Sequence, residues 1–107
     1  MRAVELGFPP SGVADGDGAV WVTDQLRDRL ARIDPATRHI TKLIHVGREP
    51  MAVVAAPSGV WVASAIDDTV SRIDPQRNKV TLRLPVGFSP TALAVDGNRI
   101  WVAGDAS

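Results

Sequence analysis

The 107-residue chain contains no cysteine, which excludes disulfide bonds, thiol catalysis and cysteine-ligated zinc. It has no excess charge, because 12 Lys and Arg residues balance 12 Asp and Glu residues, and we therefore expect no nucleic-acid partner. It also lacks any run near the roughly 18 apolar residues that a transmembrane helix needs, and we expect no membrane insertion. No leader peptide is visible. Localisation stays open: periplasmic or extracellular if a signal peptide precedes Met1, otherwise cytoplasmic.

An internal repeat with a constant period dominates what is present. Trp21, Trp61 and Trp101 are 40 positions apart, and each lies between two β-branched residues. The same interval relates three glycines, three prolines and a repeated Asp-Pro pair: Gly7, Gly47 and Gly87; Pro10, Pro50 and Pro90; Asp34-Pro35 and Asp74-Pro75. The chain is therefore built from repeated structural units.

Each period holds four short apolar segments separated by turn residues, and none keeps a helical period. In the second unit we predict strands at 51–56, 59–64, 69–74 and 79–86, and a shift by one period in either direction gives the others. The Asp-Pro pairs predict type I turns between the third and fourth strands. Four antiparallel strands in each unit, with apolar residues on both faces of the second strand, are typical of a β-propeller blade.

The blade sequences resemble the YVTN/NHL-type β-propeller repeats of bacteria. The resemblance rests on Val60-Trp61-Val62-Ala63, Val70-Ser71-Arg72-Ile73-Asp74-Pro75 and Val86-Gly87-Phe88-Ser89-Pro90. It implies a ring of about seven such units, and it implies that ligands approach the end where the second strand connects to the third and the fourth to the next unit.

The phase of the repeat predicts an all-β fold: a β-propeller fragment of about 2.5 four-stranded antiparallel blades in a single partial domain, residues 1–107. We predict a partial strand at 2–6, a blade at 7–46, a blade at 47–86 and a half-blade at 87–107. Propellers close with four to eight blades. We expect the remaining blades in a longer chain, because joining copies of this chain leaves one strand missing at each junction and exposes a sheet edge.

The links at the ligand-facing end differ between units, and variable loops on a fixed scaffold are frequent binding sites. Ordinary solvated side chains are the alternative at each position. The predicted binding residues for an unknown protein or small molecule are Arg27, Asp28, Arg48, Glu49, Asp67, Asp68 and Phe88.

Other groups point to chemistry less directly. Asp15-Gly16-Asp17-Gly18 has alternating carboxylates, as calcium loops do, but we interpret it as a tight turn. Histidine is the usual general base near neutral pH, but His39 and His45 both fall on the predicted fourth strand of the first unit, and we interpret them as surface residues. The tryptophans suit a stacking platform, although their β-branched neighbours favour a role in the core between blades.

These patterns favour a noncatalytic binding scaffold, part of a larger bacterial sensor or repeat protein, with no catalytic residue, metal or cofactor predicted. The alternative is a metal-dependent enzyme that resembles the virginiamycin B lyase propellers. That family's "tryptophan-phenylalanine-threonine-glutamate" motif has its nearest match in Trp21-Val22-Thr23-Asp24, where one shortened carboxylate remains and no matching histidine follows.

Overall fold

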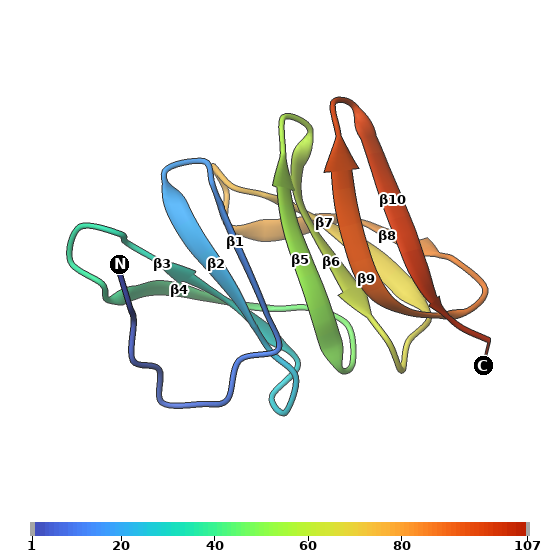
Figure 1. The fold of residues 1–107 in the computed structure, drawn as a ribbon, viewed down its shortest axis with the longest axis horizontal. Coiled ribbons are helices and arrows are strands. Elements are labelled where there is room, and N and C mark those ends of the chain that lie inside the picture. The colour runs from blue at the N-terminus through green and yellow to red at the C-terminus, as the bar shows by residue number, and fades with distance from the viewer. Residues whose placement is uncertain (1, 107) are drawn as a thin grey trace.

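The computed structural model describes residues 2–106, which form ten β-strands (Figure 1). Met1 and Ser107, the ends of the predicted domain, lie outside the described residues. Residues 2–106 contain no helix long and apolar enough to cross a membrane. The strands are β1 (Gly12–Gly16), β2 (Ala19–Asp24), β3 (Arg29–Ile33), β4 (Ile40–His45), β5 (Pro50–Ala56), β6 (Gly59–Ser64), β7 (Thr69–Asp74), β8 (Lys79–Pro85), β9 (Ser89–Asp96) and β10 (Arg99–Asp105).

The strands form three antiparallel sheets in chain order. The first sheet is β1–β4, the second sheet is β5–β8, and the third sheet is the hairpin β9–β10. The eight strands of the first two sheets lie within one residue of their predicted bounds, so the all-β, four-stranded prediction is confirmed. Figure 1 shows the three sheets side by side, with β1, β5 and β9 as neighbours, and contacts join β1 to β5 and β5 to β9.

The hairpin β1–β2 turns through Asp17 and Gly18, whose φ angles are 55° and 72°. A two-residue type I′ turn requires positive φ at both central residues, and its twist matches that of the strands. Glycine has no Cβ to oppose this backbone, and aspartate tolerates it better than most residues. Residues 15–18 are thus the tight turn that the sequence predicts.

The links from β3 to β4 and from β7 to β8 begin at Asp34 and Asp74. Each carboxylate Oδ1 accepts a hydrogen bond from the backbone amide two residues later, at 2.8 and 2.9 Å. The backbone bond, however, runs from the amide of Arg38 or Asn78 to the Asp carbonyl, at 2.7 and 2.8 Å. Each link therefore closes over five residues, with Arg38 and Asn78 at left-handed φ angles of 64° and 55°, one residue beyond the predicted four-residue turn.

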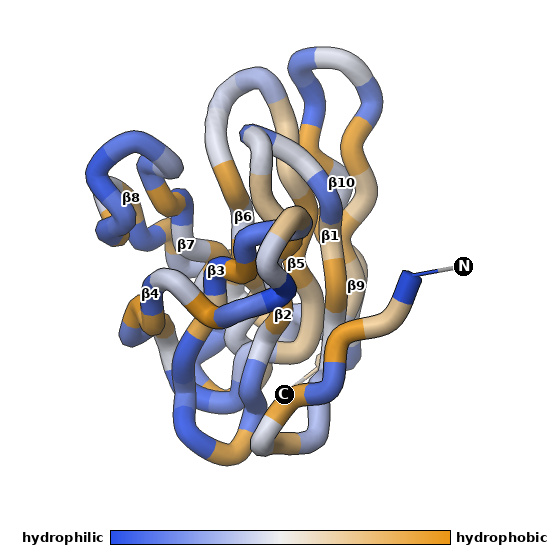
Figure 2. Tube along the Cα trace, turned by 90° about the vertical axis from the view of Figure 1, so that its left-hand side faces the viewer, coloured by the Kyte–Doolittle hydropathy of each residue, from blue (hydrophilic) through white to orange (hydrophobic). Residues whose placement is uncertain are grey.

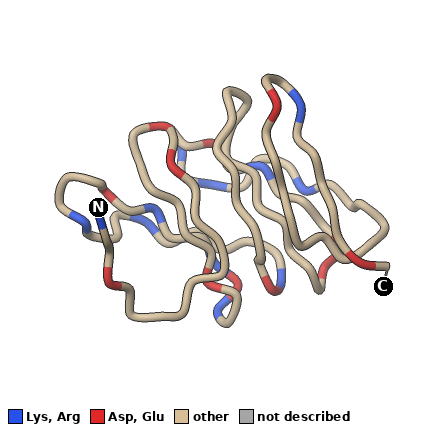
Figure 3. The backbone as a smooth tube through the Cα atoms, viewed as in Figure 1, with Lys and Arg blue, Asp and Glu red and all other residues tan. Residues whose placement is uncertain are grey.

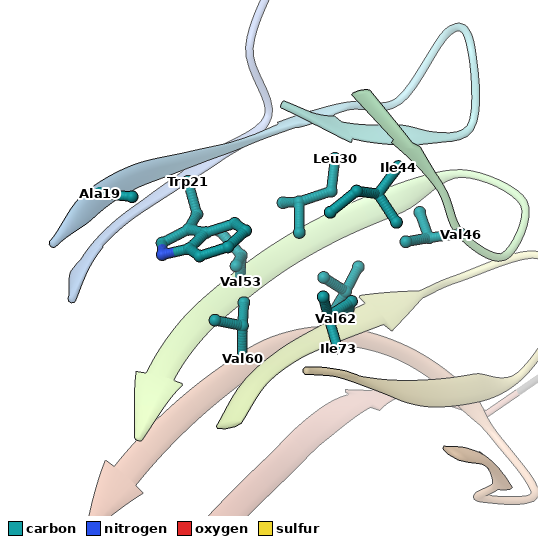
Figure 4. Packing of buried hydrophobic residues seen from close by; sticks show 9 residues of the cluster. All are labelled: Ala19, Trp21, Leu30, Ile44, Val46, Val53, Val60, Val62 and Ile73. Carbon is teal, nitrogen blue, oxygen red and sulfur yellow. The ribbon is translucent and has the colours of Figure 1, made fainter. Parts of the chain in front are cut away.

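The main core lies between the first and second sheets (Figure 4). Side chains alternate between the two faces of a strand, so each sheet contributes every second residue to this layer. The indole nitrogen of Trp21 donates to the Gly16 carbonyl at 3.0 Å, which satisfies its polar atom inside the core. The first sheet and the link after it supply Ala19, Trp21, Leu30, Ile44 and Val46, and the second sheet supplies Val53, Val60, Val62 and Ile73.

Trp21 and Trp61 each point toward the sheet that follows them in the chain. Trp21 faces the complete second sheet and is 0% exposed. Trp61 alternates with the buried Val60 and Val62 and therefore points the other way, toward the two-stranded third sheet, and it is half-buried. No sheet follows Trp101 within residues 2–106, and this side chain is 58% exposed. The core prediction is thus confirmed for Trp21 and in part for Trp61, and it stays a prediction for Trp101, whose face no described residue fully covers.

Residues 2–10 contain no strand, which corrects the predicted partial strand at 2–6. A fourth strand needs a third strand as its hydrogen-bonding partner, and none of the described residues occupies that position. Val4 and Leu6 nevertheless pack on the outer face of the first sheet against the cluster of Phe8, Val22, Ala31 and Ile33. These two residues lie one period before Ile44 and Val46, which pack on the second sheet in the corresponding way. The segment therefore has the side-chain contacts of a fourth strand but not its backbone hydrogen bonds.

The outer strands β4 and β8 carry many hydrophilic residues, as Figure 2 shows. His45 ends β4 and is exposed, in agreement with its interpretation as a surface strand residue. His39 is also exposed but precedes β4 and belongs to the turn, so its placement on the strand is wrong by one residue.

Candidate functional site

Four links meet at one end of the sheets: residues 25–28, 46–49, 65–68 and 86–88. The first and third connect β2 to β3 and β6 to β7, and the second and fourth connect β4 to β5 and β8 to β9. We call this the link end. It is the lower end in Figure 1, and Figure 3 shows acidic and basic residues close together there.

Backbone hydrogen bonds join each link to its neighbour. The Val46 amide donates to the Asp28 carbonyl at 2.9 Å, and the Ala65 amide donates to the Glu49 carbonyl at 2.9 Å. At the third junction the Val86 amide donates to the Asp68 carbonyl at 2.9 Å. The Ser89 hydroxyl adds a bond to the Ala65 carbonyl at 3.0 Å. The links are therefore held by one another as well as by their strands.

Two of the predicted binding carboxylates bind this backbone. Asp28 Oδ1 accepts from the Glu49 amide at 2.9 Å, and Asp67 Oδ2 accepts from the Arg48 amide at 2.8 Å. Asp28, Glu49 and Asp68 adopt left-handed φ angles of 57°, 58° and 55°. The left-handed backbone has a signal in the repeat, since Asp28 and Asp68 are identical residues one period apart.

The buried acid of the link end is Asp24, which was not among the predicted binding residues. Its side chain is 0% exposed and forms ion pairs with Arg29 Nε at 3.0 Å and Arg27 Nη1 at 3.3 Å. The guanidinium carbon of Arg29 also lies 5.5 Å from the centroid of the Phe8 ring. Asp24 is the carboxylate of the motif that resembles the lyase propellers. It is paired with two arginines. The corresponding position in the second sheet holds Ser64, whose buried hydroxyl has no hydrogen-bond partner among the described residues.

The side chains that face solvent at the link end are both charged and apolar. Arg27, Arg48 and Asp67 are exposed. Leu26 and Ile66, at equivalent positions of the two repeats, are 67% and 55% exposed. An apolar residue in the middle of the same link in both units is a signal that points to Leu26, which the sequence prediction missed.

Three successive links at the boundary between the first and second sheets carry five of the predicted residues: Arg27, Asp28, Arg48, Glu49 and Asp67. Asp68 and the half-buried Phe88 lie at the next junction, between the second and third sheets. The seven residues thus line one end of the molecule but divide between two junctions.

In residues 2–106, no three His, Cys, Asp or Glu side chains lie close enough together to hold a metal ion. The arrangement suits recognition of a partner by exposed apolar and charged groups on a fixed backbone.

No family model and no curated protein matches the chain. Several solved structures, in contrast, are similar to the chain. Hydrazine synthase from Kuenenia stuttgartiensis is similar with a TM-score of 0.82 and 24% identity, over 95% of this chain and 31% of that chain. Apo AztD from Citrobacter koseri gives 0.72 and 16% identity, over 82% of this chain and 26% of the other.

A catalytically inactive virginiamycin B lyase from Staphylococcus aureus, solved with quinupristin, gives a TM-score of 0.77 and 20% identity, over 94% of this chain and 37% of that chain. The fold is that of a β-propeller segment. The chain spans about a third of the length of these structures. At these identities the likeness concerns the fold alone.

Proposed function

We propose that this propeller segment is a noncatalytic binding scaffold that recognises a protein or peptide with apolar and charged side chains at its link end. One observation carries the proposal: Leu26 and Ile66 are exposed at equivalent positions on links that hydrogen bonds hold in place. Exposed apolar groups next to Arg27, Arg48 and Asp67 offer both a hydrophobic contact and charge selection.

We further propose that the segment belongs to a larger bacterial sensor or repeat protein that supplies the remaining blades. The coverage of 26–37% of the similar structures supports this proposal. It also agrees with the uncovered faces at both ends of the row of sheets.

The alternative of a metal-dependent lyase gains no supporting observation from residues 2–106. Asp24, the one carboxylate of the matching motif, is paired with Arg27 and Arg29 and is buried. We therefore retain the binding scaffold as the proposed function.

The test begins with a random-sequence peptide library selected on the immobilised chain. The affinity of a selected peptide is then measured calorimetrically for the wild type and for the double variant Leu26→Ser/Ile66→Ser. We expect a loss of at least about tenfold in affinity, about 1.4 kcal/mol. Leu82→Ser removes a leucine that is 42% exposed on β8, away from the link end, and should leave binding unchanged.

Equal affinity for the wild type and the double variant would contradict the proposal. So would a peptide whose binding depends on Val13, because Val13 lies on the outer face of the first sheet rather than at the link end.

A further inference from the structure

A polar hollow lies at the end of the sheets opposite the link end. We call this opposite end the turn end, because it carries the turns within each sheet. The hollow has a volume of about 390 Å³ and lies where the first sheet meets Asn78 of the second sheet. Figure 1 shows the link from β7 to β8 beside the turn of β1 and β2. Both walls belong to complete four-stranded sheets, unlike the uncovered faces at the two ends of the row.

Two cations of the first sheet line this hollow side by side. Arg32 and Lys42 are directly opposite each other across β3 and β4. Arg32 also pairs with Trp21 across β2 and β3, so all three side chains belong to the face that is turned toward the second sheet. Like charges directly opposite each other in a sheet repel and are destabilising. Neither Arg32 nor Lys42 forms an ion pair with a described residue, so no direct contact compensates this repulsion.

The guanidinium group of Arg32 is held in a fixed orientation. Its Nη1 donates to the Pro75 carbonyl and, at 2.7 Å, to Asn78 Oδ1. Its central carbon lies 5.0 Å from the centroid of the Trp21 ring. A guanidinium carries five N–H donors, and within residues 2–106 no acceptor binds those on Nε and Nη2 of Arg32. These donors are therefore oriented in advance for an acceptor from outside the chain.

Asn78 adds a donor from the second sheet. Because its Oδ1 accepts from Arg32, the orientation of the amide is fixed. The amide NH₂ group donates to no acceptor among the described residues, so it too can serve an external ligand.

One carboxylate, that of Asp34, lines the same hollow. Its Oδ1 accepts a hydrogen bond from the Ala36 backbone amide at 2.8 Å, and it pairs with neither cation. Arg32 and Lys42 together outweigh this single negative charge. The hollow therefore combines an excess of positive charge with several unused N–H donors, which favours an anion.

We propose that this hollow binds a phosphate group, either as the free ion or as the monoester of a small molecule. The planar fork of arginine matches two oxygens of a phosphate, and lysine contributes a point charge. The NH₂ group of Asn78 binds a further oxygen, so the ligand bridges the first and second sheets. The proposal does not depend on the proposed function, because the turn end and the link end are at opposite ends of the sheets.

The second unit provides an internal comparison. Arg72 occupies the position of Arg32, but the residue opposite it is Leu82 rather than a lysine. The pair of opposed cations is thus specific to the first unit, and Lys42 is the residue that creates it. The substitution Lys42→Leu gives the first unit the residue that the second unit already has.

Two variants and one control test the proposal. Lys42→Leu removes an exposed cation of the hollow, and Asn78→Asp keeps an oxygen acceptor for Arg32 while replacing the NH₂ donor by a negatively charged oxygen. Arg83→Leu removes the same amount of charge from an exposed position of β8 that does not line the hollow. Thermal unfolding without phosphate checks that each variant is folded.

Inorganic phosphate is titrated at pH 7.5 and constant ionic strength, and NMR follows the side-chain NH₂ of Asn78 and the Nε–H of Arg32. In the wild type and in Arg83→Leu we expect both signals to shift along one saturable curve. Lys42→Leu should weaken the affinity at least about tenfold, with the Arg32 signal as its reporter, and Asn78→Asp should abolish binding. Phenyl phosphate in place of the free ion should also bind if the ligand is a monoester, whereas acetate should bind at least about tenfold more weakly than inorganic phosphate.

Signals that do not saturate in the wild type would overturn the proposal. An affinity that Lys42→Leu leaves unchanged would do the same, as would an equal loss in Lys42→Leu and Arg83→Leu, because net charge rather than the hollow would then govern binding. Acetate that binds as tightly as phosphate would contradict the assignment of a phosphate group.

Discussion

Trp21 and Trp101 occupy the same position of the same repeat, yet Trp21 is 0% exposed and Trp101 is 58% exposed. Their strands have the same hairpin pairing, and their immediate neighbours are β-branched in both cases. The difference comes from the following sheet, which is complete beside Trp21 and absent beside Trp101 in the part of the chain that the structure describes. Burial in this fold is therefore a property of the contact between sheets rather than of a single strand.

The largest predicted effect separates these two tryptophans. Trp21→Ala should destabilise the chain by about 3–5 kcal/mol, because it leaves a cavity between two sheets. Trp101→Ala should change the free energy of unfolding by less than about 0.5 kcal/mol, as surface substitutions usually do, and Trp61→Ala should fall between the two. Urea unfolding at a low protein concentration provides the measurement, and similar values for Trp21→Ala and Trp101→Ala would be incompatible with the comparison.

A second prediction compares Asp24 with Ser64, which hold equivalent positions in the first and second sheets. Asp24→Ala should cost about 2–3 kcal/mol, because it removes a buried acceptor that binds two arginines. Ser64→Ala should be close to neutral or stabilising, since the Ser64 hydroxyl is buried without a protein partner. Thermal unfolding of both variants tests the pair, and a larger cost at Ser64 would reverse the interpretation.

The third prediction concerns the repeated arginines. Arg32 reaches the second sheet through Asn78 Oδ1 at 2.7 Å, and its guanidinium carbon lies 5.0 Å from the centroid of the Trp21 ring. Arg72 instead binds Thr81 Oγ1 at 2.8 Å within its own sheet. Arg32→Ala should therefore cost about 1–2 kcal/mol, and Arg72→Ala less than about 1 kcal/mol. Equal losses in chemical denaturation would show that the contact between sheets adds nothing.

The smallest predicted effect is electrostatic. A hydrogen bond from the Gln76 backbone amide lowers the pKa of Asp74 below its ordinary value, with further lowering by the Arg77 amide and its nearby charge. Because the pKa is lower in the folded state, the stabilisation is present above the ordinary pKa of aspartate and is lost as the pH falls through the folded value. Asp74→Asn should flatten the acid side of the stability profile slightly, whereas an unchanged profile would speak against this linkage.

The repeat predicts most of the fold because turn residues and apolar alternation recur at one interval. The strands of the second unit and the tight turn at residues 15–18 follow from these local rules. The same rules do not predict that residues 2–6 form no strand. Val4 and Leu6 have the side-chain contacts of a fourth strand, but none of the described residues provides its hydrogen-bonding partner. Likewise, Trp101 reads as a core residue in sequence, and only the arrangement of sheets shows that its face is uncovered.

The candidate site was predicted less completely than the fold. Antiparallel connectivity correctly places the links at one end, but it does not tell which carboxylates bind backbone amides, as Asp28 and Asp67 do. The ion pairs of Asp24 depend on contacts between strands and a link, so no spacing in the sequence reveals them. Leu26 was missed, although the apolar residue at the equivalent position of the next unit, Ile66, was a signal in the repeat.

The most direct test of sheet-dependent burial uses the three indole N–H groups as reporters in one two-dimensional NMR spectrum. The wild-type chain at low concentration is the suitable sample, because contacts between molecules are then rare. A soluble paramagnetic agent should attenuate the Trp101 signal most, the Trp61 signal to an intermediate degree and the Trp21 signal least. Equal attenuation of all three signals, or stronger attenuation of Trp21 than of Trp101, would contradict the account.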